Sequence, residues 1–298
     1  MRLRLQLTPL SGRINISLNY SYYLSTAIYR WIEVSSKDYS AFLHDSGFRV
    51  DNSVKRFKHF CFSQLIVPRR RISNGRLEIL SPSVEWYIAM PVEASLQHLV
   101  VGMFEKREFF IEREENRFVV EQVETIPEPK WERRMVFRML SPTTVSTMHE
   151  RNGRLLPEYL LPSDPRLVDL LRQNILHKYR SLHCRSECHS DLQGNSARTI
   201  TSDGLPATFG SGRQAGQSDQ LADTDFRCTL DDEFITNRGG PEKITKLITV
   251  KEGREDETRV RGFMCPVTIE GNLALTALAY ESGLGEKNSL GFGMLEVV

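Results

Sequence analysis

The sequence predicts an α+β protein made of two tandem ferredoxin-like (RRM-like) domains, with a disordered insertion in the second. In the first half, strand-like and helix-like patterns alternate in the order β-α-β-β-α-β, which is the ferredoxin-like order. The second half repeats this outline after a proline-containing joint, and one long polar segment interrupts it. We therefore predict an N-terminal domain at residues 1–127, a C-terminal domain at 131–298, and an insertion at about 184–240.

The first strand and first helix have clear patterns. At residues 2–10, Arg or Gln alternates with Leu, as in a strand with one buried face. A helix near Tyr20 to Ser35 carries one apolar stripe, because its large side chains recur every three or four residues. The stripe consists of Leu24, Ala27, Ile28, Trp31 and Ile32. A shorter helix, DYSAFLHDSG, is expected to end at Gly47, because glycine suits helix C-termini.

The rest of the first domain completes the pattern. The segments FKHFCFSQLIV, GRLEILS and VEWYIAM are rich in aromatic and branched residues and predict strands. After Pro91, a second helix carries the stripe Leu96, Leu99, Val100, Met103 and Phe104. FFIEREENRFVVEQVETI then predicts one or two closing strands.

The second domain begins after the joint TIPEPKWE. RRMVFRMLSPTTV predicts its first strand, and the next helix is expected to be capped by Ser163, with Pro165 in its first turn. Strands TKLITV and VRGFMCPVTIEG follow, then a short helix capped by Asn272 and a last strand, GFGMLEVV. Residues 184–240 are full of Ser, Gly, Gln, Asp and Thr, and such a segment cannot bury enough apolar surface to offset its ordering entropy.

Composition limits the protein class. The 298 residues suffice for roughly two domains. No apolar run approaches the ~20 residues of a membrane helix, and the N-terminus alternates rather than forming a signal peptide, so we expect a cytoplasmic protein without membrane contact. Five cysteines, an odd number, favour reduced thiols. A net charge of +1 means that any nucleic-acid surface must be a local patch.

The stretch GLGEKNSLGFG, residues 283–293, is the most unusual motif. A dinucleotide fingerprint needs a preceding strand and a following helix, and here that order is reversed. A phosphate-binding P-loop needs Gly-Lys followed by Ser or Thr, and this loop reads GEKNS. The remaining alternatives are a glycine-rich turn, or a loop whose glycines let another backbone approach while Lys287 adds charge.

These residues carry a resemblance to a known family. YESGLGEKNSLGFG resembles the C-terminal signature of the CRISPR-associated repeat-cleaving endoribonucleases, the Cas-six family, where a glycine-rich loop packs near the RNA. NYSYYLSTAIYRWI, FLHDSG and KHFCFS match the family's N-terminal half in order and spacing. The resemblance implies an endoribonuclease that cleaves CRISPR precursor RNA within its repeats to give guide RNAs. It also implies no metal or cofactor, and it names repeat RNA and other subunits of an effector complex as partners.

The implied reaction is attack of the RNA 2′-hydroxyl on the adjacent phosphate, leaving a 2′,3′-cyclic phosphate and a 5′-hydroxyl. The resemblance assigns it to Tyr29, His44 and a lysine; Lys58 matches best, and Lys55 is close enough to substitute. Tyr29 lies roughly 130° from the centre of its helix's apolar stripe, so we expect it toward the exposed side, where it could equally be a surface tyrosine. A phenol of pKa near ~10 is a poor base, so orienting the 2′-hydroxyl is its larger role. The helix C-terminus and Asp45 both favour protonated His44, the form that a general acid requires.

RNA contacts are expected from local basic residues and from the glycine-rich loop, although charge runs are most often solvated faces. The predicted RNA-binding residues are Lys55, Arg69, Arg70, Gly283, Gly285, Lys287, Gly291 and Gly293.

Two alternatives stay open. One is a relative that binds repeat RNA without cutting it and holds the guide in an effector complex; Tyr29 and His44 together favour the enzyme. The other is a zinc site at HCRSECH, residues 183–189, although its spacing differs from that of the usual CxxC pairs.

Overall fold

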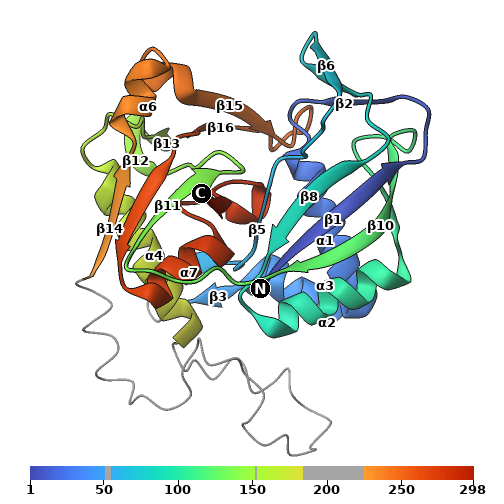
Figure 1. The fold of residues 1–298 in the computed structure, drawn as a ribbon, viewed down its shortest axis with the longest axis horizontal. Coiled ribbons are helices and arrows are strands. Elements are labelled where there is room, and N and C mark those ends of the chain that lie inside the picture. The colour runs from blue at the N-terminus through green and yellow to red at the C-terminus, as the bar shows by residue number, and fades with distance from the viewer. Residues whose placement is uncertain (51–54, 152, 184–224) are drawn as a thin grey trace, which may run out of the picture.

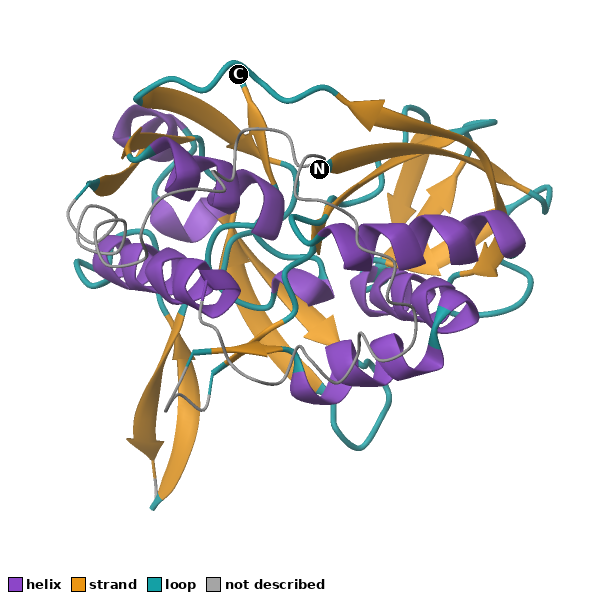
Figure 2. Ribbon diagram, turned by 90° about the horizontal axis from the view of Figure 1, so that it is seen from below, coloured by secondary structure: helices purple, strands orange, loops and turns teal. Residues whose placement is uncertain are grey.

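The computed structural model describes residues 1–50, 55–151, 153–183 and 225–298. Two mixed domains lie side by side, the N-terminal one coloured blue to green and the C-terminal one green to red (Figure 1). In each domain the helices cover one face of the sheet (Figure 2). Within the described residues, no helix has both the length and the apolar character needed to cross a membrane.

The N-terminal sheet has five antiparallel strands in the order β5-β8-β1-β10-β9. They are β1 (Arg2–Pro9), β5 (Cys61–Phe62), β8 (Val84–Ala89), β9 (Glu108–Phe110) and β10 (Arg117–Ile126). Without the edge strand β9, chain order and sheet order are those of a ferredoxin-like domain, as predicted. Helices α1 (Ser21–Ser35) and α3 (Glu93–Glu105) pack against each other beneath this sheet.

The predicted apolar stripe of α1 is confirmed, since all five members are buried. The stripe of α3 is narrower than predicted. Leu96, Leu99 and Met103 are buried, whereas Phe104 is exposed. The two helices cross so closely at Gly102 that a Cβ there would lie 1.7 Å from the carbonyl oxygen of Trp31. Only glycine permits this crossing.

Smaller elements connect this framework. They are β2 (Ile14–Ser17), α2 (Lys37–Ala41), a π-helical turn (Phe42–Ser46), β3 (Phe48–Arg49), β4 (Arg56–Phe57), β6 (Arg70–Ser73) and β7 (Arg76–Ile79). The helix that ends at Gly47 is confirmed, because Gly47 has φ of 58° and donates its N–H to the carbonyl of Phe42. The strand predicted for FKHFCFSQLIV is shorter, because His59 adopts a left-handed φ of 50° that interrupts the extended chain.

The C-terminal domain repeats the same topology, with strands in the order β14-β17-β11-β18. The strands are β11 (Arg134–Met139), β14 (Phe226–Leu230), β17 (Val267–Gly271) and β18 (Leu295–Val297), and the helices are α4 (Leu167–His183) and α7 (Leu273–Ser282). The predicted cap of α7 is confirmed, since the Asn272 side chain accepts from the backbone N–H groups of Ala274 and Leu275. The cap predicted at Ser163 is wrong, because α4 begins four residues later, at Leu167.

The predicted insertion, 184–240, needs a correction. Residues 184–224 lie outside the described part of the chain. Residues 225–240 are structured, and they form β14 and the short helix α6 (Asp232–Asn237). Phe226, Cys228 and Leu230 alternate along β14 and are buried, which explains why this segment joins the sheet.

The strand predicted at TKLITV is present, but it lies outside the main sheet of the C-terminal domain. It forms β15 (Thr245–Val250), which pairs with β16 (Thr258–Phe263) in a hairpin separate from the main sheet. A second hairpin is made by β12 (Ser146–Arg151) and β13 (Arg154–Tyr159). Pro241–Ile244 and Asn288–Leu290 are single 3₁₀ turns.

Buried contacts join the two domains. His59 lies between Ser181 of α4 and Ser282 of α7, at 2.8 and 3.1 Å from their hydroxyl oxygens. Arg2 donates to the carbonyl of Tyr280 at 2.8 Å and stacks on its ring. The seam between the domains is therefore a packed interface.

Candidate active site

The structure brings the three predicted catalytic side chains together from three separate segments. The rings of Tyr29, from α1, and His44, from the π-helical turn, meet edge to face with centroids 5.5 Å apart. Lys58, which follows β4, donates its ammonium to the carbonyl of His44. The π-helical turn that carries His44 is a local geometry found often at functional sites, and a helical periodicity does not predict it.

His44 is held by its neighbour and remains open to solvent. Its Nδ1 lies 2.7 Å from Oδ1 of Asp45, and 70% of its side chain is exposed. The contact with His44 is the main reason why the pKa of Asp45 lies below its ordinary value. The predicted pairing of His44 with Asp45 is thus present, and Nε2 is left for a ligand.

Tyr29 is less exposed than predicted. It is half-buried, and it packs against Phe60 and the core of the N-terminal domain. This burial raises the pKa of its phenol, and the side chain of Ser289 in the glycine-rich loop partly opposes the shift. The helical angle placed Tyr29 off the stripe correctly, but the loop from the other domain covers that face.

Lys58 lies in an electropositive and partly dry setting. Burial lowers the pKa of its ammonium to about 8, and the charge of Arg56 acts in the same direction. Gly47 makes room for this lysine, since a Cβ there would lie 3.3 Å from its Nζ and 2.7 Å from the carbonyl of Phe57.

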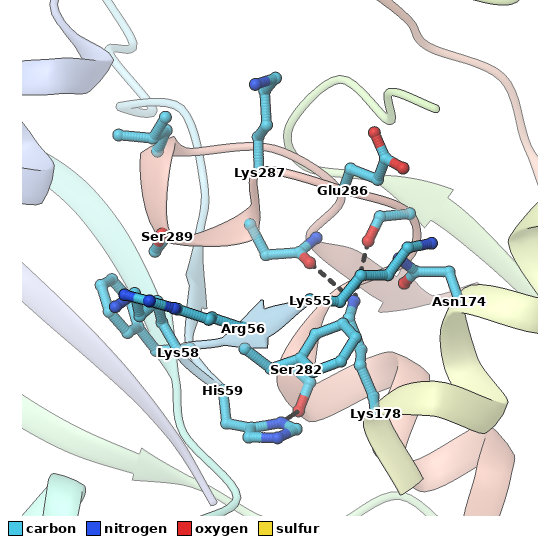
Figure 3. Close-up of a pocket in the computed structure, with 15 residues that line it drawn as sticks. Lys55, Arg56, Lys58, His59, Asn174, Lys178, Ser282, Glu286, Lys287 and Ser289 are labelled. Atoms are coloured by element: carbon cyan, nitrogen blue, oxygen red, sulfur yellow. Dashed lines mark hydrogen bonds between the residues drawn. The ribbon is translucent and has the colours of Figure 1, made fainter. Parts of the chain in front are cut away.

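A cavity of about 360 Å³ opens beside these residues, between the two domains. Its walls include Lys55 and Lys58 from the first domain and Gly285, Lys287 and Ser289 from the second. The volume lies within the range of ligand pockets. Figure 3 shows Lys178 beneath the loop with its amine directed at it, while Lys287 points away.

The four predicted RNA-binding glycines are buried, and their close contacts are with protein. All have φ between 75° and 86°. A Cβ at Gly291 would lie 2.7 Å from the ring of Phe62 in the first domain. At Gly285 and Gly293, a Cβ would lie 2.5 Å from the carbonyl of Thr144 and 2.0 Å from that of Leu284. These glycines allow a tight loop to fit into the seam, and their contact with RNA remains a prediction.

Arg69 and Arg70 lie apart from this cluster. They enter the β6–β7 hairpin, which Figure 1 shows at the far end of the molecule from β3. Both are exposed, and they donate to the carbonyls of Leu80 and Val67. Any contact that they make with RNA would be distant from Tyr29.

Sequence reasoning missed two buried residues of the seam, His59 and Lys178. Lys178 of α4 is 3% exposed and donates to three oxygens of the glycine-rich loop. A signal existed, because Leu171, Ile175 and Lys178 fall on one helical face, which places a lysine in an apolar stripe. Burial lowers the pKa of His59 and brings that of Lys178 to about 7.

The zinc alternative lies mostly beyond what the structure describes. Of HCRSECH, only His183 is described, and its ring stacks on Tyr179. Among the described residues, no group of three His, Cys, Asp or Glu side chains is arranged to hold a metal ion.

The structure thus combines two ferredoxin-like domains with a cluster of Tyr29, His44 and Lys58 on the first and a glycine-rich loop on the second. The chain belongs to the Cas6 family of CRISPR-associated proteins. Residues 15–124 match the family's model of the Cas6 N-terminal region, and residues 126–297 match that of the C-terminal region.

Individual relatives agree along the whole chain. The CRISPR-associated endoribonuclease Cas6 1 of Methanocaldococcus jannaschii is 24% identical over 99% of this chain and 92% of its own. An endoribonuclease-like Cas6 protein of Pyrococcus furiosus, whose name leaves its activity open, is 24% identical over 100% and 99%.

Solved structures share the fold. A Cas6-related protein from Pyrococcus furiosus matches with a TM-score of 0.71 and 22% identity over 100% of this chain and 98% of its own. A protein described as an RAMP protein binding different RNA substrates matches with a TM-score of 0.70 and 22% identity over 100% and 99%.

Proposed function

We propose that this protein is the endoribonuclease that cuts CRISPR precursor RNA within its repeats, by a metal-independent reaction in the cytoplasm. The observation that carries the proposal is the meeting of Tyr29, His44 and Lys58 beside a cavity lined by lysines. Three segments that are separate in sequence supply the group types that cleavage by a 2′-hydroxyl requires.

Each group has a role that suits its setting. Since burial raises the pKa of the Tyr29 phenol even further above neutral pH, the phenol orients the 2′-hydroxyl as a hydrogen-bonding partner, and the released proton passes to water. The 2′-oxygen forms a bond to phosphorus while the bond to the 5′-oxygen breaks. Protonated His44, oriented by Asp45, donates to the leaving 5′-oxygen, and Lys58 stabilises the charge on the phosphorane.

The test uses repeat RNA from the CRISPR array of the encoding genome, incubated with protein in excess EDTA. We expect a single cut, a 2′,3′-cyclic phosphate on the upstream fragment and a 5′-hydroxyl on the other. A substrate with one 2′-deoxy substitution just upstream of the cut should bind but stay intact, because it lacks the nucleophile. Cleavage of that substrate, or loss of activity in EDTA, would contradict the mechanism.

The second candidate function is repeat binding without cleavage. This candidate is retained because the name of the Pyrococcus furiosus relative leaves the activity of that relative open. It predicts tight binding of the same RNA and no product at any pH.

A further inference from the structure

The buried amine of Lys178 is fully used by the glycine-rich loop. It donates to the carbonyls of Gly283 and Gly285 at 2.7 and 2.9 Å and to Oδ1 of Asn288 at 2.6 Å. In its protonated form this amine has three N–H donors, so each has one acceptor. Gly283 is also the C-cap of α7, where the unpaired carbonyls of a helix favour a positive charge.

Asn288 extends this hold to the other arm of the loop. Its Nδ2 donates to the carbonyls of Leu284 and Phe292, at 3.3 and 3.0 Å. Lys178 and Asn288 together therefore tie the beginning, the middle and the end of the loop to one point. A buried polar network with every member paired specifies a single conformation.

The loop held in this way packs against the candidate active site. The turn Asn288–Leu290 contacts both α1 and β5 of the first domain. Gly291 lies so close to Ser21 and Phe62 that there is no room for a side chain at this position. The side chain of Ser289 lies close enough to the phenol of Tyr29 to act on its ionisation.

We propose that Lys178 is a positioning residue for cleavage, which acts by locking the glycine-rich loop in the shape that holds Tyr29. The inference rests on the proposed function, since it names what supports the tyrosine of that site. The second domain thereby completes the site of the first.

The test is a double-mutant cycle on cleavage of repeat RNA. Lys178→Met keeps an unbranched apolar stem of similar length and removes all three N–H donors. We expect kcat to fall at least tenfold with KM little changed. In a Tyr29→Phe background, the same change should have almost no further effect, because its route is already lost. Lys243→Met, at an exposed lysine of the same domain, is the matched control and should cleave normally.

A merely structural role would give equal losses in both backgrounds and would overturn the proposal, as would an unchanged kcat. If Lys178→Met does not fold, Ser289→Ala replaces it, with a smaller loss of about threefold that also vanishes beside Tyr29→Phe. If the wild type cuts no repeat RNA, the proposed function fails. The cycle is then read from unfolding midpoints, where additive shifts would show that Lys178 and Tyr29 are not linked.

Discussion

The first helix of each domain occupies the same topological place, yet the two helices have different tasks at the seam. In the N-terminal domain α1 carries Tyr29, which is half-buried beside an exposed His44. In the C-terminal domain α4 carries Lys178, which is 3% exposed and consumed by three internal hydrogen bonds. A ligand can reach Tyr29 and His44, whereas the buried amine of Lys178 is not available to it. The N-terminal domain thus carries the candidate catalytic groups, and the C-terminal domain fixes a loop.

The largest effect should follow from His44→Ala, which removes the proposed general acid of the N-terminal domain. Loss of a general acid slows cleavage by about 10²–10⁴-fold, while affinity for uncut repeat RNA should change little. Single-turnover rates and a binding titration measure both. His149→Ala, at an exposed histidine of the C-terminal domain, serves as control. A wild-type rate in His44→Ala would remove this residue from the mechanism.

Gly291→Ala changes the glycine-rich loop of the C-terminal domain. A side chain at φ of 86° costs about 1–3 kcal/mol, and its Cβ would also press on Phe62 across the seam. We expect a lower free energy of unfolding in chemical denaturation. Gly12→Ala is the control, because nothing lies within 4 Å of a Cβ there. Equal stability of the two variants would show that the seam adapts easily.

The pH dependence of kcat tests the role of Lys58 in the N-terminal domain. With a pKa of about 8, Lys58 is positive below that pH and becomes neutral as pH rises through it. If its charge stabilises the phosphorane, kcat should fall about tenfold for each pH unit above 8. Lys58→Arg keeps its charge, so its kcat should fall less steeply above pH 8 than that of the wild type. Identical profiles would assign the charge to another residue, with Lys55 the next to test.

The smallest effect is expected far from the seam. Arg70→Ala, on the β6–β7 hairpin, should weaken repeat binding a few-fold and lower the salt dependence by about one unit if Arg70 contacts a phosphate. Binding measured across salt concentrations gives the slope. Arg166→Ala is the control, since Arg166 is paired with Asp164 at 2.7 Å. A slope unchanged by Arg70→Ala would leave this arginine as a solvated surface charge.

Much of the fold was accessible from local patterns. The stripe from Leu24 to Ile32 and the cap at Asn272 are short-range signals, and both are confirmed. Strand β14 was missed because FRCTL follows a long polar segment, and its five residues obtain their partners from β17, far along the chain. Pairing of that kind is a tertiary fact that a local window does not contain.

The site was accessible in part. Family-like segments identified Tyr29, His44 and Lys58, and the structure places them together, although their roles remain predictions. The glycines at 283–293 were noticed, but backbone freedom alone does not reveal that protein atoms fill the space beside them, and their contact with RNA remains a prediction. Lys178 was missed because a lysine in an apolar stripe is usually assumed to reach solvent.

The place of the glycine-rich loop in the chain has a consequence for biosynthesis. Ribosomes synthesise a chain from its N-terminus to its C-terminus, and domains generally fold as they emerge. The first domain, with Tyr29 and His44, is therefore complete while residues 283–293 are still unmade. Since that loop covers Tyr29 and packs on Phe62, the partly synthesised protein has its candidate catalytic residues without the loop that supports them. If the protein cuts RNA as proposed, this competence should appear only after residues 283–293 have been made and β18 has joined β11.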